Sequence, residues 1–319
     1  MSGTIDTKGL IEGVRAGDTR ALARAITLVE DGDPAAYELV AALYPHTGRT
    51  RAVGFTGPPG VGKSSLISAL VARVRAENAT VGVISVDPSS PFTHGALLGD
   101  RIRLADHFVD PGVFIRSMGT RGHAGGLAEA TLQALLLLDA AGKDVVFLET
   151  VGSGQSDIGV LSIADTVVLA LQPGSGDSVQ ALKAGIMEIP DVIAVNKCEN
   201  PLAGSTANDV RQVLALGPSD VAKPPVILTD ALTGVGLDEL WAAIEEHGKA
   251  PGLEERRRRN LSAEVFAVAS ARARRHLESA VAEHPELARL LQQVQRREVD
   301  PLSAVRAILT EVFGLTEPD

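Results

Sequence analysis

The residues from Gly57 to Ser64, GPPGVGKS, fit the pattern G-x-x-x-x-G-K-S/T at every fixed position, and they lie between an apolar run and an amphipathic helical segment. Glycines in such a loop allow successive backbone N–H groups to surround a phosphate, and the N-terminus of the following helix adds a partial positive charge. The motif therefore requires a strand before it and a helix after it, and it predicts a nucleoside triphosphate site. A chance match in a glycine-rich turn is the alternative, and the flanking segments argue against it.

The lysine and the serine at the end of this motif are expected to have different roles in binding the nucleotide. We expect the Lys63 ammonium group to reach the β- and γ-phosphates and to contribute to catalysis, and we expect the Ser64 hydroxyl to bind Mg²⁺. The residues predicted to surround the phosphates are Gly57, Pro58, Pro59, Gly60, Val61, Gly62, Lys63, Ser64 and Ser65.

Short apolar runs rich in β-branched residues recur after Arg49. They are AVGFTG, TVGVISVD, GVFIRSM, DVVFLET, TVVLALQP, DVIAVNK and PPVILTD, and helical patterns occur at 64–77, 126–141, 207–216 and 237–247. Because the runs are almost wholly apolar, we expect a sheet that is covered by helices on both faces. The alternation predicts an α/β P-loop NTPase fold with a mostly parallel sheet and right-handed crossovers.

Helical patterns without strands flank this region on both sides. Leu22, Ile26 and Val29 form an apolar stripe before it, and after it Pro285 and Asp300-Pro301 mark helix boundaries. The C-terminal helices have too little core to form a domain alone. The predicted division is an N-terminal helical segment at 1–48, a P-loop domain at 49–250 and a C-terminal arm at 251–319.

Charge and composition exclude several classes of protein. The formal net charge of −10 argues against a nucleic-acid or anionic-membrane binder. The run Glu255–Arg259, ERRRR, lies in an arm with as many acidic residues as arginines, so we expect a solvated helix face or a subunit contact. No apolar run reaches ~18 residues, and the first residues lack a signal or transit pattern, which predicts a cytoplasmic protein. Cys198 is the single cysteine and excludes an intramolecular disulfide.

Two later segments indicate the base. In VIAVNKCEN an apolar strand ends in N-K-C-E, which matches the N-K-x-D segment of GTPases with an acid that is one methylene longer. That acid accepts the N1–H and the exocyclic amine together, a donor pair that only guanine offers. The segment DAL stands where GTPases carry a loop whose backbone N–H meets guanine O6. Polar exits from two strands are the alternative interpretation. The predicted base-binding residues are Asn196, Lys197, Glu199, Asp230, Ala231 and Leu232.

Several longer segments together resemble the MeaB/MMAA/ArgK group of G3E GTPases over nearly the whole chain. They are GDTRALARAITLVE, VDPSSPFTHGALLGDRIRL, SMGTRGHAGGL, ETVGSGQSD and LQPGSGDSVQALKAGIMEIPDVIAVNK. The resemblance implies a GTPase that uses GTP and GDP and acts as a chaperone of an adenosylcobalamin-dependent acyl-CoA mutase such as methylmalonyl-CoA mutase. It would gate cofactor loading and protect or reactivate the mutase. The resemblance also implies a homodimer joined through the C-terminal arm.

Three carboxylates are candidates for the Mg²⁺ site. We expect Asp87 to end a strand that neighbours the P-loop strand, Asp100 to lie in a segment that resembles the first switch, and Glu149 to end a third strand at the same edge. Because Mg²⁺ prefers oxygen ligands, we assign Ser64 and Asp100 as direct ligands, and Asp87 and Glu149 as direct or water-mediated ones. Glu149 would also orient the attacking water. The alternatives are a turn aspartate for Asp87 and a solvated loop charge for Asp100.

The segment after Glu149 carries an unusual residue for a GTPase. In many GTPases a glutamine follows the glycine of the second switch, whereas here Ser153 follows Gly152. A serine is a weak substitute, and Gln155 is the residue that would compensate. We therefore expect slow intrinsic turnover and a partner that completes the site.

The segment 173–183, PGSGDSVQALK, resembles a further switch of the family through which nucleotide and partner communicate. Asp177 and Lys183 are its charges, and an ordinary loop with Asp177 as a helix cap is the alternative. Arginines gather around the first switch, some to stabilise phosphate charge or else as solvated surface residues. They are Arg101, Arg103, Arg116 and Arg121. Arg101, Gly152, Ser153, Asp177 and Lys183 are assigned to switching or partner contact, and Lys63, Glu149, Gln155 and Lys183 to catalysis.

Two other functions fit a P-loop protein. A P-loop kinase would phosphorylate a small molecule or a protein and would not need the guanine-type segments. A metal-insertion GTPase would need a metal motif, whereas His94 and His123 lack metal-ligand spacing with one another.

Overall fold

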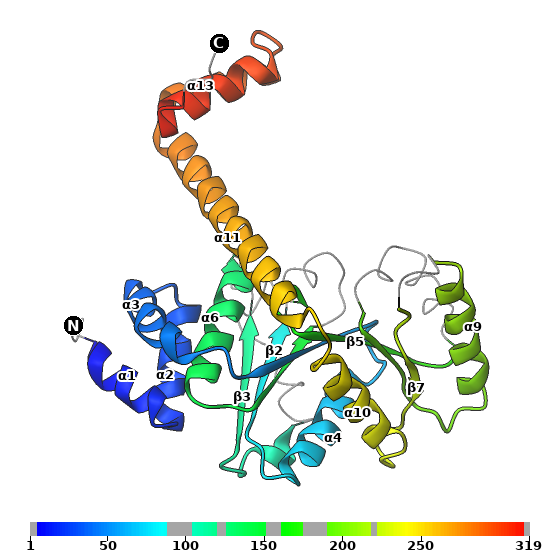
Figure 1. Ribbon diagram of the computed structural model, residues 1–319. Helices are drawn as coiled ribbons and strands as arrows, with labels where there is room; N and C mark the ends of the chain where they lie inside the picture. The colour runs from blue at the N-terminus through cyan, green and yellow to red at the C-terminus, as the bar shows by residue number, and fades with distance from the viewer. Residues whose placement is uncertain are drawn as a thin grey trace. The chain divides into compact units, whose positions relative to one another are not determined.

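The computed structural model describes residues 5–87, 104–119, 126–150, 161–174, 190–217 and 222–315 (Figure 1). The chain forms two compact units, which are Met1–Glu264 and Val265–Asp319. The first unit holds the sheet, and the second consists of helices.

The sheet has seven strands in the order β3-β2-β4-β1-β5-β6-β7, and every described pair is parallel. All seven apolar runs singled out in the sequence form strands, and the predicted α/β class is confirmed. The strands are β1 (Arg51–Thr56), β2 (Val81–Asp87), β3 (Val113–Gly119), β4 (Val145–Thr150), β5 (Thr166–Leu171), β6 (Val192–Val195) and β7 (Val226–Leu228).

The strand order corrects one prediction. We expected the strand that ends in Asp87 to neighbour the P-loop strand, but β4 lies between β1 and β2. Glu149 is instead the residue beside the P-loop strand, because its Cα pairs with that of Phe55. The apolar pattern of a strand shows that it is buried and does not show which strand lies beside it, so the order was open until the crossovers were known.

Helices cover both faces of the sheet, as Figure 1 shows. Asp18 and Asp33 begin two of them, since their carboxylates accept hydrogen bonds from the backbone N–H groups of Ala21 and Ala35. Within the described residues, the helices of the first unit are α1 (Thr7–Arg15), α2 (Thr19–Glu30), α3 (Pro34–Leu43), α4 (Lys63–Arg75), α6 (Gly126–Ala140), α9 (Ala203–Ala215), α10 (Leu237–His247) and the beginning of α11 (Leu253–Glu283), with short 3-10 turns η1 (Tyr44–His46) and η2 (Ala105–His107).

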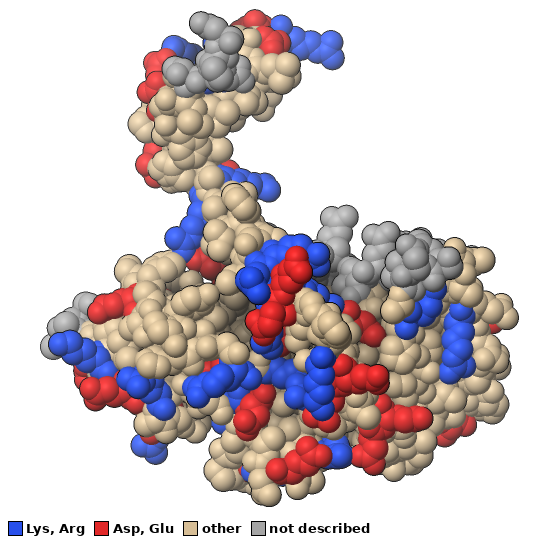
Figure 2. All heavy atoms as spheres, viewed as in Figure 1, with Lys and Arg blue, Asp and Glu red and all other residues tan. Residues whose placement is uncertain are grey.

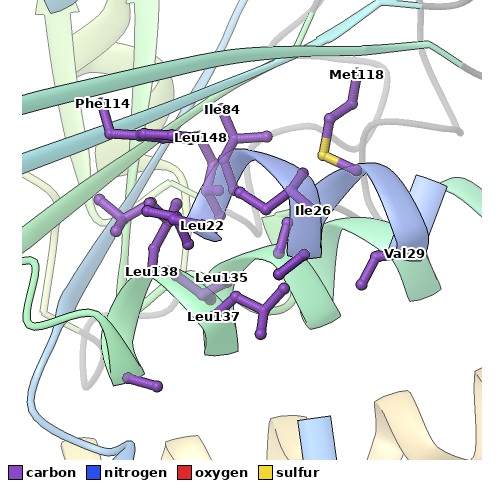
Figure 3. Close-up of a cluster of buried hydrophobic side chains, with 14 of the residues drawn as sticks. Leu22, Ile26, Val29, Ile84, Phe114, Met118, Leu135, Leu137, Leu138 and Leu148 are labelled. Carbon is purple, nitrogen blue, oxygen red and sulfur yellow. The ribbon is translucent and has the colours of Figure 1, made fainter. Parts of the chain in front are cut away.

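One core layer joins the N-terminal helices to the sheet. Leu22 and Ile26 of α2 and Leu138 of α6 meet Ile84 and Leu148 of the strands in one buried cluster (Figure 3). The N-terminal helices therefore belong to the same hydrophobic core as α6 and this face of the sheet.

The opposite face of the sheet packs against α4 and α10. Leu66 of α4 and Trp241 of α10 share a buried cluster with Phe55 and Phe147. The rings of Phe55 and Phe147 lie edge to face at 5.8 Å between centroids. This cluster holds the beginning of α4, and therefore the turn before it, against the centre of the sheet.

Arg116 of β3 does not join a phosphate-facing cluster. Its guanidinium group forms an ion pair with Glu30 and donates a hydrogen bond of 3.0 Å to the Thr27 hydroxyl, both on α2. The suggestion that Arg116 stabilises phosphate charge is therefore wrong, and the side chain instead ties β3 to the N-terminal helices. Arg101, Arg103 and Arg121 lie outside the described residues.

The basic run at the start of α11 is also different from the expected solvated face. Arg256 forms an ion pair of 2.7 Å with Asp191, and Arg257 forms one of 2.6 Å with Asp165. Burial acts to raise the pKa of Asp191, but hydrogen bonds from Arg256 and His247 outweigh it and lower that pKa to about 2. Two of the four arginines therefore anchor α11 to the amino-terminal ends of β5 and β6.

The second unit contains the rest of α11, α12 (Pro285–Gln295) and α13 (Pro301–Phe313). As predicted, Pro285 begins one helix and Asp300 caps the next, accepting hydrogen bonds of 3.0 Å from the N–H groups of Leu302 and Ser303. Apolar side chains of this unit are exposed, among them Phe266 and Leu302. Among the described residues, no helix combines the length and the apolar composition that crossing a bilayer requires.

Candidate nucleotide-binding site

The loop between β1 and α4 has a backbone that only glycine allows. Gly57, Gly60 and Gly62 all have positive φ angles, of 134°, 79° and 95°. A Cβ atom on Gly57 would lie 2.1 Å from the carbonyl oxygen of Ala170, and one on Gly62 would lie 2.5 Å from the side-chain nitrogen of Asn196. The glycines predicted to shape this loop are therefore required by its conformation and by close neighbours.

Lys63 lies at the first position of α4 and is buried, at 6% exposed. Its ammonium group donates hydrogen bonds to the carbonyl oxygens of Gly57 at 2.7 Å and Pro58 at 3.1 Å. The charge is thus held over the loop, where a phosphate oxygen can replace a carbonyl oxygen as its acceptor.

Ser64 and Glu149 are brought together from distant parts of the chain. The Ser64 hydroxyl donates a hydrogen bond of 2.5 Å to one oxygen of Glu149, and Ser85 donates one of 3.2 Å to the other. All three side chains are buried. Ser85 was not predicted to be part of the site, although a serine in an otherwise apolar strand was a signal that it has a polar neighbour.

The described part of this cluster offers oxygen atoms alone. A hydroxyl from Ser64 and a carboxylate from Glu149 are the donor types that Mg²⁺ takes, alongside phosphate oxygens and waters. These residues therefore fit Mg²⁺ by chemistry. No group of three or more His, Cys, Asp or Glu side chains suited to a metal occurs among the described residues. The side chain of Asp87 and the whole of Asp100 lie outside them.

Asn196 connects the predicted base segments to the phosphate loop. Its side-chain nitrogen donates to the Val61 carbonyl at 2.9 Å, and its side-chain oxygen accepts a hydrogen bond of 3.2 Å from the N–H of Ala231. Asn196 is almost fully buried, at 2% exposed. The structure therefore brings together three segments that are far apart in sequence, as expected.

Lys197 extends this connection. It has a positive φ of 59°, and its ammonium group donates to the Gly60 carbonyl at 2.9 Å and to the Gln172 side chain at 2.8 Å. Gln172 follows β5 and was not predicted as a site residue. Its place at the carboxyl end of an apolar strand was the available signal, since ligands in open parallel sheets bind at that edge.

Glu199 and Asp230 lie together at the outer end of the site. The hydrogen bond between their carboxyl groups raises the pKa of Glu199 and lowers that of Asp230. Asp230 also accepts hydrogen bonds from the N–H groups of Leu232 at 2.8 Å and Thr233 at 2.9 Å, which shape the loop. Leu232 is 92% exposed. Asp230 thus organises this loop and interacts with Glu199.

Several predicted site residues lie outside the described residues. They are Asp100, Arg101, Gly152, Ser153, Gln155, Asp177 and Lys183. The other predicted residues gather at the carboxyl edge of the sheet, around the loop that follows β1.

Comparisons with known proteins show similarity over most of the chain. The family model described as methylmalonyl Co-A mutase-associated GTPase MeaB matches residues 22–285. A relative in Pyrococcus abyssi is 45% identical over 96% of each chain, and the GTPase ArgK of Escherichia coli is 37% identical over 73% of each chain. The crystal structure of a LAO/AO transport system kinase covers 98% of this chain and is itself 99% covered, with a TM-score of 0.74 and 26% identity.

Proposed function

This chain belongs to the MeaB family of methylmalonyl-CoA mutase-associated GTPases, and from that premise we propose that it is a Mg²⁺-dependent chaperone of an adenosylcobalamin-dependent acyl-CoA mutase. Its reaction is hydrolysis of GTP to GDP and phosphate. In the proposal, hydrolysis gates cofactor loading and protects or reactivates the mutase. The observation that carries the proposal is the match to this family model over residues 22–285.

The phosphate loop supplies binding and charge. We assign the backbone N–H groups of residues 57–65 to the phosphates and the ammonium group of Lys63 to the β- and γ-phosphates, where it stabilises negative charge in the transition state. In the described structure this ammonium group already lies over the loop, on the Gly57 and Pro58 carbonyls.

The buried oxygens beside the loop supply the metal site. We assign the Ser64 hydroxyl as a ligand of Mg²⁺ and Glu149 as a direct or water-mediated one, with Asp87 and Asp100 as the further carboxylates. Bound Mg²⁺ would neutralise charge on the β- and γ-phosphate oxygens. Ser85 keeps Glu149 oriented through its hydrogen bond of 3.2 Å, so that this carboxylate is able to position the attacking water.

The base segments supply selectivity for guanine. We assign Glu199 to the N1–H and exocyclic amine of guanine, Asn196 to holding the segments together, and the loop at 230–232 to guanine O6. The hydrogen bond that Asn196 donates to the Val61 carbonyl and the one that it accepts from the N–H of Ala231 support this assignment, since they link its own segment to the phosphate loop and to the loop at 230–232.

Partner control forms the next part of the proposal. Ser153 stands where many GTPases have a water-positioning glutamine, so we propose that intrinsic turnover is slow and that the mutase completes the site. The residues that we assign to switching or partner contact are Arg101, Gly152, Ser153, Asp177 and Lys183, and Gln155 is assigned to catalysis. Fast single-turnover hydrolysis by the isolated protein, unchanged by any mutase, would refute partner control and leave the GTPase activity intact.

A co-elution experiment tests the chaperone role. Full-length protein is passed over a gel-filtration column with a purified acyl-CoA mutase in three arms, with a non-hydrolysable GTP analogue, with GDP and without nucleotide. We expect a complex that depends on the nucleotide and GTP hydrolysis that is faster when mutase is present. GTP hydrolysis with no complex in any arm, for each of the known acyl-CoA mutases, would reject the chaperone role alone.

We also propose a homodimer joined through the C-terminal arm. Exposed apolar side chains of the second unit, including Phe266, Leu302 and Val305, support an interface there.

The proposal also keeps the division of the chain into 1–48, 49–250 and 251–319, and it keeps the cytoplasmic location. Figure 2 shows acidic and basic side chains interspersed over the visible face of the first unit, which supports a protein without a nucleic-acid partner. Light scattering of the full chain and of a Phe266→Glu variant tests the dimer.

A kinase is the second candidate function, because the solved relative is called a kinase. A kinase transfers the γ-phosphate to an acceptor, whereas a GTPase releases it to water. Measuring free phosphate with and without candidate acceptors separates the two. Tight stoichiometric binding of Ni²⁺ or Zn²⁺ would instead favour metal insertion.

A further inference from the structure

A cavity of about 180 Å³ lies in the first unit, at the opposite edge of the sheet from the phosphate loop. It is bounded by residues at the amino-terminal ends of β1 and β5, by α6 and by the beginning of α11. Leu132, Leu135 and Leu136 of α6 form an apolar wall, and Leu261 of α11 faces the same space. Because parallel strands run in one direction, this site is separate from the nucleotide edge of the sheet.

Glu264 of α11 lines this cavity with a carboxyl group that has a partner for only one of its oxygens. The residue is 3% exposed, and one carboxyl oxygen is buried without a hydrogen bond among the described residues. The other oxygen accepts a hydrogen bond of 3.3 Å from Ser162. Burial raises the pKa of Glu264, and the charge of Glu129 adds to that shift. An unsatisfied carboxyl oxygen at this depth is costly unless a donor completes it.

The other charged groups of the cavity already have partners. Asp139 accepts hydrogen bonds from the backbone N–H groups of Gly48 at 2.5 Å and Thr50 at 3.1 Å. Asp165 is paired with Arg257 at 2.6 Å, and that hydrogen bond raises the pKa of Arg257. These interactions stabilise the fold, and Glu264 differs from both residues because one of its carboxyl oxygens is buried without a hydrogen-bond partner among the described residues.

The charge balance of the lining indicates what kind of group Glu264 would accept. Three carboxyl groups, of Asp139, Asp165 and Glu264, line the cavity together with one guanidinium group, that of Arg257. A cation is favoured there, because it restores the ionised form of Glu264 and supplies the missing hydrogen bond. The leucine wall favours a carbon chain attached to that cation.

We propose that this cavity is a binding site for a small organic cation, a primary alkylammonium ion. Its N–H groups would donate a hydrogen bond to the unpartnered carboxyl oxygen of Glu264, and its carbon chain would pack on the leucines of α6. The volume corresponds to about six water molecules, which sets the ligand at about six non-hydrogen atoms. This inference is independent of the mutase and of the nucleotide site.

Titration calorimetry of the full-length protein with butylammonium chloride, in a KCl buffer of matched ionic strength, tests the proposal. We expect saturable binding, and we expect 1-butanol, which has the same chain without the charge, to bind at least about tenfold more weakly. Failure to saturate with butylammonium, or competition by KCl at equal concentration, would overturn the alkylammonium site.

Two variants assign the binding to Glu264. Glu264→Gln should weaken butylammonium binding by about tenfold or more, and thermal unfolding should show that it folds, since removal of a buried unpaired charge is well tolerated. Glu255→Gln, on an exposed face of the same helix, is the matched control and should bind as the unchanged protein does. Equal binding by the Glu264→Gln and Glu255→Gln variants would place the ligand elsewhere and overturn the proposal.

A third variant addresses the cavity itself. Leu261→Trp adds volume at a partly exposed position of the lining and should block butylammonium while leaving the unfolding temperature nearly unchanged. Undiminished binding in this variant would also overturn the proposal.

Discussion

The two edges of the parallel sheet hold their buried and half-buried carboxylates in different ways. At the carboxyl edge, the hydroxyl groups of Ser64 and Ser85 donate to Glu149. At the amino edge, guanidinium groups of α11 hold Asp165 and Asp191. At the carboxyl edge the partner of the carboxylate is a neutral hydroxyl, and a cation can take its place as that partner. At the amino edge the partner is a half-buried guanidinium group, and removing one member of that ion pair destabilises the fold strongly. The difference teaches that the same chemical group, a carboxylate, is held by neutral hydroxyl donors at one edge and fastens a helix through guanidinium groups at the other.

The largest expected effect is a loss of GTP hydrolysis when a residue at the carboxyl edge of the sheet is changed. Lys63→Ala removes the ammonium group over the phosphate loop, and the rate of GTP hydrolysis should fall by about 100-fold or more, since preorganised charge at the transferring phosphate is lost. Single-turnover phosphate release measures the effect. The exposed Lys249→Ala is the matched control and should retain the rate. A loss of less than about threefold would remove Lys63 from the catalytic assignment.

The next effect acts on stability instead of activity. Asp191→Asn leaves Arg256 without its carboxylate partner at the amino edge, and the free energy of unfolding should fall by about 3 kcal/mol. Urea unfolding measures it, and the hydrolysis rate of the folded variant should stay the same. Asp209→Asn, on an exposed face of α9, controls for the substitution. If Asp191→Asn slowed hydrolysis without destabilising the fold, the division of tasks between the edges would be wrong.

The pH dependence of this difference follows from the pKa of Asp191, which is lowered to about 2 in the folded protein. A lowered folded-state pKa stabilises the fold above the unfolded value near 3.8, and the contribution is lost as pH falls from there through about 2. The stability difference between unchanged protein and Asp191→Asn should therefore shrink by about 2 kcal/mol between pH 5 and pH 2. Urea unfolding across this range measures it, and a difference that is constant with pH would contradict the ion pair.

The smallest effect tests the support of Glu149. Ser85→Ala removes one hydrogen bond to this carboxylate and should reduce the hydrolysis rate by about fivefold, equivalent to about 1 kcal/mol. The reduction should be greatest at low Mg²⁺ concentration, because a mobile Glu149 binds the cation less well. Ser85→Thr keeps the hydroxyl and should recover most of the rate. An effect that is independent of Mg²⁺ would separate Ser85 from the metal site.

Local patterns were enough to predict much of the fold. The seven apolar runs became strands, and the stripe of Leu22, Ile26 and Val29 became a buried helix face. The resemblance to the MeaB group is confirmed by the family match. These features depend on residues close in sequence, since periodicity and glycine-rich turns act within a few residues.

Contacts between distant residues were beyond such patterns. The insertion of β4 between β1 and β2, the hydrogen bond from Ser85 to Glu149 and the contact of Gln172 with Lys197 all join residues from different strands or loops. Arg256 and Arg257 carry a charge pattern typical of a solvated face, and only their neighbours Asp191 and Asp165 make them anchors. Whether a polar residue is paired depends on what folds against it.

By itself, the sequence determined the class of the fold, the phosphate loop with its required glycines, and the family. The tertiary structure decided the order of the strands, the partners of each carboxylate and the cavity beside Glu264. The physical reason is the separation along the sequence of the residues that interact. Backbone preference and burial periodicity depend on neighbouring residues, whereas strand order and the pairing of charged groups are set by the packing of distant segments in the first unit.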